Sequence, residues 1–543
     1  TGRYRVLRRI GAGGSGIVYE AYDEVRRAPV ALKTLARLDA AALFRFKQEF
    51  RALADVSHPN LVQLHELVAD DDGWFFTMEL VLGGDVLSYI WRDDAMRNAD
   101  GDGAPAGRGT SQERLRASLA RSSGHARLAP DLERLRACFD QLAQGVGALH
   151  DAGKLHRDIK PSNVLATPEG RVVLVDFGIV ADVAAQGDGH GDADIIMGTP
   201  AYMAPEQSAL ETLGPPADWY SFGAVLYKAL TGRAPFGGDS AHVLFEKQRR
   251  EPPPPSRRAP DVPADLDELC VDLLRLDPRR RPGRDEILAR LRGAPGAPRG
   301  APRERPRAPK QELPLVGRAE PLARLEALFQ RVSPGNPAIA FVEGPPGAGK
   351  TALARAFVER LTAEGRAIVL RGRCYEREAL PYKALDGLVD ELTQRLLALP
   401  PAALARVTPR HAAPLARLFP VLERVATFAG APGGGGGGLE GPELRRRAFE
   451  GMRGLLGALG SPVPVVLFID DLHGCDTDSV ALLRALLAPP DAPAVFILAT
   501  LRDDPRGRSE GAASFVELEG GVLPLASTDR IPVPPLGAGD AES

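Results

Sequence analysis

One stretch of 25 residues, 154–178, constrains the fold of this chain more than any other part of the sequence. It reads K-L-H-R-D-I-K-P-S-N-V-L, then six residues, then V-V-L-V-D-F-G. Phosphoryl transfer to a hydroxyl needs a carboxylate at that hydroxyl and further oxygen ligands for Mg²⁺. A merely charge-rich turn between a helix and a hairpin is the alternative, but it would not require this order of residues. We therefore expect a phosphoryl-transfer site here.

The order of these residues resembles the catalytic loop and the metal-binding turn of protein kinases, in particular the bacterial eukaryotic-type (Hanks-type) serine/threonine kinases. The resemblance implies that Asp158 orients the acceptor hydroxyl and takes its proton. It also implies that Lys160 sits beside the transferred phosphoryl group, and that Asn163 and Asp176 hold Mg²⁺. We expect a bilobal kinase domain that uses ATP and Mg²⁺ to phosphorylate proteins on serine or threonine.

A glycine-rich segment near the start of the chain supports this expectation. An alternating strand, residues 4–10, leads into G-A-G-G-S-G-I-V, which fits the pattern G-x-G-x-x-G-x-V of a hairpin that covers ATP phosphates. On the following strand, V-A-L-K ends in the lysine that would pair with the α- and β-phosphates. The predicted nucleotide-binding residues of this part are Gly11, Ala12, Gly13, Gly14, Ser15, Gly16, Val18, Ala31 and Lys33.

A glutamate that would form an ion pair with this lysine is expected on the next helix. Apolar residues between 39 and 56 recur at helical spacing. Glu49 lies on this helix, ten residues before Pro59 of an H-P-N sequence, which resembles the position of the αC glutamate of kinases. Glu24 is nearer to Lys33 in sequence and is the competing candidate. We predict a Lys33–Glu49 pair.

Residues 74–87 resemble the kinase hinge that binds adenine. In this resemblance Met78 stands at the back of the adenine pocket, and the backbone groups of Glu79 and Val81 bond the adenine edge. Asp85 would reach the ribose. Because backbone groups read the adenine, side-chain identity is a weak signal in this segment.

The loop after the metal-binding turn departs from the kinase pattern. Kinases are commonly activated when a phosphorylated residue in this loop pairs with the arginine of H-R-D, here Arg157. Residues 178–197 contain no Ser, Thr or Tyr, but they contain four aspartates, Asp182, Asp188, Asp192 and Asp194. One hypothesis is that a carboxylate replaces the phosphate, so that activity does not depend on phosphorylation of this loop. The alternative is a solvated acidic loop.

The sequence G-T-P-A-Y-M-A-P-E, residues 198–206, follows. Thr199 resembles the threonine that hydrogen-bonds Asp158 in serine/threonine kinases, which argues against a tyrosine kinase. Glu206 is predicted to form a buried ion pair with Arg281. Asp218 resembles the aspartate that supports the backbone of the catalytic loop.

A second phosphate-binding motif starts more than 300 residues into the chain. The apolar strand 339–342 leads into G-P-P-G-A-G-K-T, which matches G-x-x-x-x-G-K-[ST] in the strand, loop and helix context that this motif requires. Backbone N–H groups would cradle phosphates, the lysine would neutralise them and the threonine would ligate Mg²⁺. A chance match in a glycine-rich chain is the alternative. The predicted residues are Gly344, Pro345, Pro346, Gly347, Ala348, Gly349, Lys350 and Thr351.

A second apolar strand, 465–471, ends in two carboxylates. Asp470 would hold Mg²⁺ through water, and Asp471 would orient the attacking water. Together with the V-G-R sequence before the P-loop, this pattern resembles the AAA-like ATPase domain of STAND signalling proteins, in particular those fused behind kinases in bacterial regulators. In that resemblance Arg502 is a candidate γ-phosphate sensor. His473 stands where such ATPases often carry glutamine, which leaves the surroundings of Asp471 open.

The expected fold class is therefore multidomain, α+β and α/β, with a bilobal protein kinase fold followed by a P-loop NTPase domain built on a parallel sheet. A chain of 543 residues is too long for one core, and the Pro- and Arg-rich composition after Leu291 is typical of an extended linker. The expected domains are a kinase at 1–291 (small lobe about 1–80, large lobe about 81–291, surface insertion about 91–130), a linker at 292–312 and an ATPase domain at 313–543.

Composition gives few further constraints. A formal net charge of −3 gives no electrostatic reason to expect nucleic acid as a partner. The four cysteines include no C-x-x-C pair, which fits a reducing cytoplasm. No apolar run is long enough for a membrane span within this stretch. Because the chain begins at Thr1 and ends where another helix would begin, we expect it to be part of a longer protein, truncated at the C-terminus.

The sequence thus favours a signal-transduction kinase with protein substrates and a regulatory ATP-binding module, through which the chain could oligomerise. Three alternatives stay open: a pseudokinase scaffold, a pure ATPase motor, and assembly controlled by ATP binding to the second domain without enzymatic work. The acceptor protein and the incoming signal cannot be read from the sequence.

Overall fold

The computed structural model describes residues 2–13, 16–35, 39–70, 73–91, 130–177, 181–182, 199–209, 213–293, 317–429, 441–503 and 527–535. Most of the predicted surface insertion and of the linker lie outside these ranges, as do Gly14, Ser15 and Gly178 and the run of six glycines. Asp188, Asp192 and Asp194 of the acidic loop also lie outside them. The chain forms two compact units, the first built mainly from residues before 305 and the second mainly from later ones. Each unit is described by itself.

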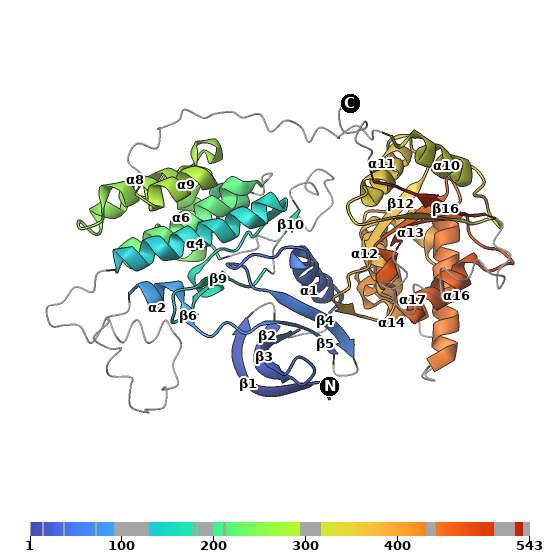
Figure 1. Cartoon of the computed structure of the whole chain (residues 1–543), viewed down its shortest axis with the longest axis horizontal. Coiled ribbons are helices and arrows are strands. Elements are labelled where there is room, and N and C mark those ends of the chain that lie inside the picture. Colours follow the sequence, from blue (N-terminus) through green and yellow to red (C-terminus); the bar gives the residue numbers. More distant parts are fainter. Residues whose placement is uncertain are drawn as a thin grey trace. The chain divides into compact units, whose positions relative to one another are not determined.

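The first unit begins with a twisted sheet in the order β1-β2-β3-β5-β4, accompanied by helix α1 (Figure 1). Neighbouring β1, β2 and β3 are antiparallel, with Val18 of β2 opposite Lys33 of β3. Helix α1 turns Phe46 and Phe50 onto Phe76 of β5, with ring centroids 4.8 and 5.8 Å apart. The elements are β1 (Tyr4–Gly13), β2 (Gly16–Asp23), β3 (Ala28–Thr34), α1 (Ala40–Leu53), β4 (Leu64–Asp70) and β5 (Gly73–Glu79).

The rest of the first unit is mainly helical. Helix α6 is buried on almost all sides, which fits its nearly uniform apolar sequence, and it ends at Gly232 in the left-handed conformation. It begins at Pro215, and prolines are well accommodated in the first turn of a helix. The elements are β6 (Gly84–Asp85), α2 (Val86–Ile90), α4 (Leu132–Asp151), β7 (Lys154–Leu155), β8 (Val164–Ala166), β9 (Val172–Leu174), β10 (Ala181–Asp182), α5 (Pro205–Ser208), α6 (Pro215–Thr231), α7 (Ser240–Lys247), α8 (Ala264–Leu273) and α9 (Arg284–Leu291).

The second unit is built on a parallel sheet in the order β12-β14-β15-β11-β16. Its central strands are buried along nearly their whole length and are mostly apolar, as expected for strands that helices cover on both faces. Alternate residues enter two separate cores. The strands are β11 (Ala338–Gly344), β12 (Ile368–Arg373), β14 (Val465–Asp470), β15 (Val495–Arg502) and β16 (Thr528–Pro532).

The helices divide between the two faces of this sheet (Figure 1). One core contains α10 and α11, and the other contains α12, α14, α16 and α17. Their bounds are α10 (Ala319–Phe329), α11 (Lys350–Ala363), α12 (Lys383–Leu397), α13 (Pro401–Val407), α14 (Ala412–Leu418), α16 (Gly441–Leu459) and α17 (Thr477–Leu487). The fold class is thus as the sequence predicts: a sheet-and-helix unit with two lobes, then an α/β unit with a parallel sheet. Helix α11 starts directly at the P-loop lysine.

Candidate active site

Three predicted residues from different elements meet in the first unit. The Nζ atom of Lys33 on β3 lies 2.6 Å from Oε1 of Glu49 on α1 and 2.7 Å from Oδ1 of Asp176, which follows β9. The side chains of Lys33 and Glu49 are 4% and 5% exposed. Glu24, the competing candidate, lies elsewhere and pairs with Arg5 at the surface. The structure therefore places Glu49, and not Glu24, on the lysine.

The charges of this cluster stabilise one another. Burial raises the pKa of Asp176, but the ammonium of Lys33 outweighs this effect and holds the pKa below its ordinary value. Burial lowers the pKa of Lys33, but the carboxylates of Glu49 and Asp176 outweigh this effect and raise it. Burial also raises the pKa of Glu49; the nearby ammonium of Lys33 lowers it, but the effect of burial is larger. A charged lysine is therefore fixed between two acidic groups, where it can meet phosphate oxygens.

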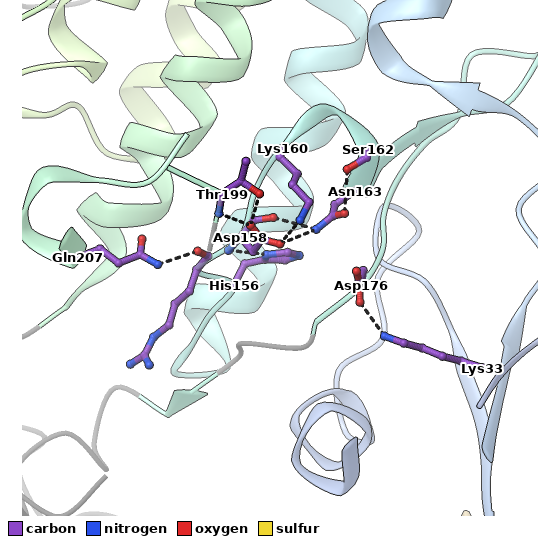
Figure 2. Close-up of polar contacts among 10 residues, drawn as sticks. Lys33, His156, Asp158, Lys160, Ser162, Asn163, Asp176, Thr199 and Gln207 are labelled. Carbon is purple, nitrogen blue, oxygen red and sulfur yellow. Dashed lines mark hydrogen bonds and ion pairs between the residues drawn. The ribbon is translucent and has the colours of Figure 1, made fainter. Parts of the chain in front are cut away.

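Asp158 lies in a second cluster, drawn in Figure 2. Its carboxylate accepts a hydrogen bond from the Nζ atom of Lys160 at 2.5 Å, and its Oδ1 atom lies 3.3 Å from the backbone nitrogen and 3.4 Å from the hydroxyl of Thr199. The amide of Asn163 donates to the backbone carbonyl of Asp158 at 2.9 Å. The predicted base, the predicted phosphoryl-side lysine and the predicted serine/threonine-type threonine are thus in direct contact.

Two residues next to or within these clusters, Arg157 and Asp176, have an uncommon backbone conformation. Arg157 and Asp176 have φ angles of 66° and 64°, in the left-handed region that side chains disfavour. The carboxylate of Asp218 on α6 accepts the backbone N–H groups of His156 and Arg157 at 2.9 and 2.8 Å, and the amide of Gln207 donates to the carbonyl of Arg157 at 2.9 Å. These buried contacts hold the catalytic loop in its strained form.

Three residues of the large lobe, Glu206, Arg281 and Asp218, have structural contacts that the sequence predicted. Glu206 on α5 and Arg281 form a buried bidentate ion pair, with N–O distances of 2.6 and 2.9 Å. Asp218 also lies 2.8 Å from Nε2 of His150. Burial raises the pKa of Asp218, but His150 and the backbone donors outweigh this and lower it.

The predicted hinge residues lie at the end of β5 and directly after it. Met78 and Glu79 end this strand, and the backbone N–H of Glu79 donates to the carbonyl of Gln63 at 2.8 Å. The side chain of Glu79 pairs with Arg171. Asp85 caps helix α2 by accepting the N–H and hydroxyl of Ser88 at 3.1 and 2.7 Å. Its carboxylate thus already has a structural partner, which the prediction of a ribose contact did not include.

The glycine-rich strand pair needs its glycine at one described position in particular. Gly16 has a φ angle of 151°, and a Cβ atom there would lie 2.2 Å from the carbonyl oxygen of Thr34. Gly11, Ala12 and Gly13 end β1, and Ala31 is buried on β3.

In the second unit the P-loop lysine is turned onto its own loop. The Nζ atom of Lys350 donates to the carbonyls of Gly344 and Pro345 at 2.8 and 2.9 Å. Burial lowers its pKa. Gly347 and Gly349 have φ angles of 80° and 88°, which only glycine adopts at little cost. The loop surrounds the start of α11, where backbone N–H groups can receive an anion.

Thr351 in the first turn of α11 contacts Asp470, the last residue of β14. The threonine hydroxyl lies 2.8 Å from Oδ1 of the carboxylate. Thr500 on the neighbouring β15 donates its hydroxyl to the same oxygen at 2.6 Å and accepts the backbone N–H of Asp471 at 2.9 Å. The side chain of Asp471 accepts from Nε of Arg373 at 2.9 Å. Asp471 is therefore held by a basic residue of β12.

Arg502 and His473 share one partner. Glu376 lies 3.2 Å from Arg502 and 3.1 Å from Nε2 of His473. His473 is buried, whereas the side chain of Arg502 is 44% exposed. The sensor role of Arg502 stays a prediction.

Sequence motifs did not reveal Thr500, Arg373 or Glu376. Arg373 ends β12, Glu376 follows it, and Thr500 lies close to the carboxyl end of β15; ligand-binding groups of open α/β sheets gather at these strand ends. Their neighbours are set by strand order, because β14 lies between β12 and β15. A search for polar residues at strand ends could have found them.

Comparison with known proteins agrees with this geometry. Residues 4–291 match the family model described as protein kinase domain, and residues 314–498 match the model described as AAA ATPase domain. The serine/threonine-protein kinase PknA of Mycobacterium tuberculosis (strain H37Rv) is 32% identical over 368 residues, which cover 65% of this chain and 72% of that protein. PrkC of Bacillus subtilis is 29% identical over 286 residues, covering 52% of this chain and 38% of its own length.

In the part of the chain that the structure describes, no helix is long and apolar enough to cross a membrane. The kinase model covers more than half of the chain, and its matched residues contain the Lys33, Asp158 and Asp176 clusters. The chain therefore belongs to the protein kinase family and carries an AAA ATPase domain behind its kinase domain.

Proposed function

We propose that the first unit is a serine/threonine protein kinase that transfers the γ-phosphate of ATP to protein hydroxyls in signal transduction. The observation that carries the proposal is the pairing of Lys33 with Glu49 and Asp176, since this is the arrangement that a kinase needs to hold ATP phosphates. The contact of Thr199 with Asp158 supports serine and threonine as acceptors. The relatives described above carry the same serine/threonine kinase name.

Each charged group has a part in the reaction. Asp158 lies where it can orient the acceptor hydroxyl and accept its proton, and Lys160 adds a positive charge next to it. Lys33 would hold the α- and β-phosphates. Because Glu49 is buried and fixes the lysine amine, the lysine does not need to reorganise when ATP binds.

Asn163 and Asp176 would hold Mg²⁺ in the kinase unit. Both present side-chain oxygens, the ligand type that Mg²⁺ prefers, and Val175 next to Asp176 is tied to Asn163 by a backbone hydrogen bond of 2.8 Å. When bound, the ion would neutralise charge on the phosphates. In the second unit the hydroxyl of Thr351 and the carboxylate of Asp470 form the corresponding oxygen pair.

The test uses the purified full chain, [γ-³²P]ATP and generic protein acceptors. Asp158→Asn should abolish transfer while ATP still binds, because the proton acceptor is lost and the shape is kept. Phosphoamino-acid analysis should show phosphoserine or phosphothreonine. Transfer that persists in Asp158→Asn, or a product labelled only on tyrosine, would refute the proposal.

The lysine clamp offers a matched pair of variants. Glu49→Gln should lower kcat strongly, because the neutral amide leaves Lys33 free to swing away. Glu24→Gln changes the same group at a surface pair and should retain activity close to that of the wild type. Equal losses in both variants would show that the pair is not specific.

We further propose that the second unit binds ATP with Mg²⁺ at residues 344–351 and regulates the kinase. Lys350→Ala should abolish nucleotide binding at this loop. Loss of protein phosphorylation in this variant would indicate coupling between the two activities, whereas unchanged phosphorylation would separate them. Slow ATP hydrolysis that depends on Asp471 would add an ATPase activity, and its absence would leave a binding module that controls assembly.

The proposal includes an expectation about the loop that follows the metal-binding turn. The Nε atom of Arg157 is buried without a hydrogen-bond partner among the described residues, and the sequence of residues 178–197 contains aspartates but no Ser, Thr or Tyr. We infer that activity does not require a phosphosite in that loop. An activating phosphate on Thr199 or Tyr202, lost with activity on phosphatase treatment, would contradict this inference.

All four cysteines are free and buried, which supports a reducing, cytoplasmic location. Oligomerisation through the ATPase domain is a further prediction, which sedimentation of the full chain with and without ATP would test.

A further inference from the structure

The last residue of helix α7, Lys247, has a fully buried side chain. Lysine is rarely buried without a charged partner, yet in the described part of the chain Lys247 forms no ion pair. Its amine donates instead to two backbone carbonyls, those of Pro200 and Met203, at 2.5 and 2.6 Å. The ring of Tyr220 lies 5.5 Å from the amine. The buried amine therefore serves the backbone of residues 200–203.

This environment disfavours the charged amine. Burial lowers the pKa of Lys247 to about 7. A side chain kept at such a cost is expected to satisfy groups that have no other partner. The two carbonyls are such groups, since a turn at this place leaves them outside any helix or strand.

The anchored turn is directly linked to the reacting atoms. Thr199, which precedes it, contacts Asp158 through its N–H and its hydroxyl. The hydroxyl of Tyr202 within the turn accepts a hydrogen bond from Lys228 of α6 at 3.1 Å. Helices α6 and α7 thus hold one short segment from two sides.

The same end of α7 makes one more contact with this region. Gln248, the next residue, donates to the hydroxyl of Ser208 on α5 at 3.1 Å. On that helix, Gln207 donates to the carbonyl of Arg157 in the catalytic loop. The end of α7 therefore touches both sides of the segment that borders Asp158.

An acceptor protein must place its hydroxyl at Asp158, so the chain around that hydroxyl has to pass along the residues that border Asp158. The turn at 200–203 directly follows Thr199 and is bonded to its carbonyl through the N–H groups of Tyr202 and Met203. Its carbonyls are fixed by Lys247, whereas Lys33 and Asp176, the residues proposed to hold ATP, belong to other parts of the chain. Disturbing the turn should therefore affect the acceptor more than the nucleotide.

We propose that Lys247 is a positioning residue for the acceptor polypeptide. Its amine fixes the turn at 200–203, and through it Thr199, so that the acceptor hydroxyl meets Asp158 in register. The inference rests on the proposed kinase function. It assigns to the last residue of α7 a role in positioning the acceptor, separate from the binding of ATP.

The test measures steady-state kinetics of the full chain with a peptide acceptor and, separately, the hydrolysis of ATP in the absence of acceptor. Lys247→Met keeps the length of the side chain and removes its donors. The KM for the peptide should rise roughly tenfold or more, since two hydrogen bonds from a polar amine are lost. The KM for ATP and the rate of acceptor-independent hydrolysis should change less than about twofold.

A matched control is Leu266→Ala on α8, a buried change that leaves the turn contacts in place. It should lower thermal stability without raising the peptide KM selectively. If Lys247→Met fails to fold, judged by circular dichroism, Lys247→Arg carries the comparison. Its planar guanidinium cannot reproduce both short contacts, so a smaller rise in the peptide KM is expected.

Three outcomes would overturn the inference: an unchanged peptide KM in the folded variant, an equal loss of peptide transfer and of ATP hydrolysis, or a rise in the KM for ATP alone. Absence of any transfer by the wild type would instead refute the proposed function, so the two failures are distinguishable.

Discussion

Replacing Arg281 by methionine should destabilise the kinase unit strongly. The guanidinium of Arg281 donates two hydrogen bonds to Glu206 and three to the backbone carbonyls of Arg275, Pro216 and Leu276. Its side chain is 0% exposed and that of Glu206 is 7% exposed. Methionine fills much of the same space but leaves the carboxylate buried and unpaired. We expect a loss of about 3 to 5 kcal/mol in the free energy of unfolding.

The chain provides a selective probe for this measurement. Its three tryptophans are Trp74, Trp91 and Trp219, and all of them lie within residues 4–291, which match the protein kinase model. Tryptophan fluorescence during urea denaturation therefore follows the kinase unit and is silent for the parallel sheet of the second unit. At unchanged slope, the expected loss corresponds to a shift of the unfolding equilibrium by roughly a hundred-fold to several thousand-fold.

A double-mutant cycle separates the pair from the packing. Glu206→Leu alone should cost less than Arg281→Met, because the guanidinium keeps its three carbonyl partners. The variant with both changes should recover about 2 kcal/mol relative to the sum of the single losses, since no buried charge is left unpaired. A loss below about 1 kcal/mol for Arg281→Met, or strictly additive changes, would show that the buried pair is not the source of stability.

Three further predictions concern other buried groups of the two units. Burial lowers the pKa of Lys247 from 10.5 to about 7, so the unfolded chain binds more protons than the folded chain between these pH values. The free energy of unfolding of the wild type, relative to that of Lys247→Met, should therefore rise between pH 7 and 9.5, with a slope of up to about 1.4 kcal/mol per pH unit. Equal pH profiles of the two proteins in urea denaturation would contradict a buried amine. Thr500→Val removes the hydroxyl that bridges the carboxylate of Asp470 and the N–H of Asp471. Mg²⁺-dependent binding of a fluorescent ATP analogue should then weaken roughly tenfold, when both proteins also carry Lys33→Met. Unchanged binding would argue against a role for this bridge. Gly344→Ala would place a Cβ atom 2.3 Å from the carbonyl oxygen of residue 533, so limited proteolysis should cut the second unit faster than in the wild type, while equal rates would mean that the loop relaxes freely.

Much of the kinase site could be predicted because its residues are short motifs with fixed spacing. Asp158, Lys160 and Asn163 lie within six residues of one loop, so local sequence already places them close together. The Lys33–Glu49 pair was also predicted, although its members lie on different elements. Here helical register indicated Glu49, and the structure excludes Glu24, which lies in a surface pair.

The predictions were weaker where a side chain has several suitable partners. Asp85 has the right position for a ribose contact, but it also stands at the start of α2, where an aspartate caps free N–H groups. Thr500 and Lys247 carry no motif at all. The partner of Thr500 is Asp470 on β14, 30 residues away in sequence, and the nearest partner of Lys247 by distance is Pro200, 47 residues away.

Local sequence was enough to predict the chemistry: two phosphate-binding units, the carboxylates and lysines expected to serve them, and the order in which they occur, because these signals lie in short motifs. Tertiary structure alone decided which buried polar groups support that chemistry. Lys247, Thr500 and Arg373 became recognisable only when strand order and helix packing brought them to the site. The reason is physical, since a buried polar side chain is retained for partners that are close in space and distant along the chain.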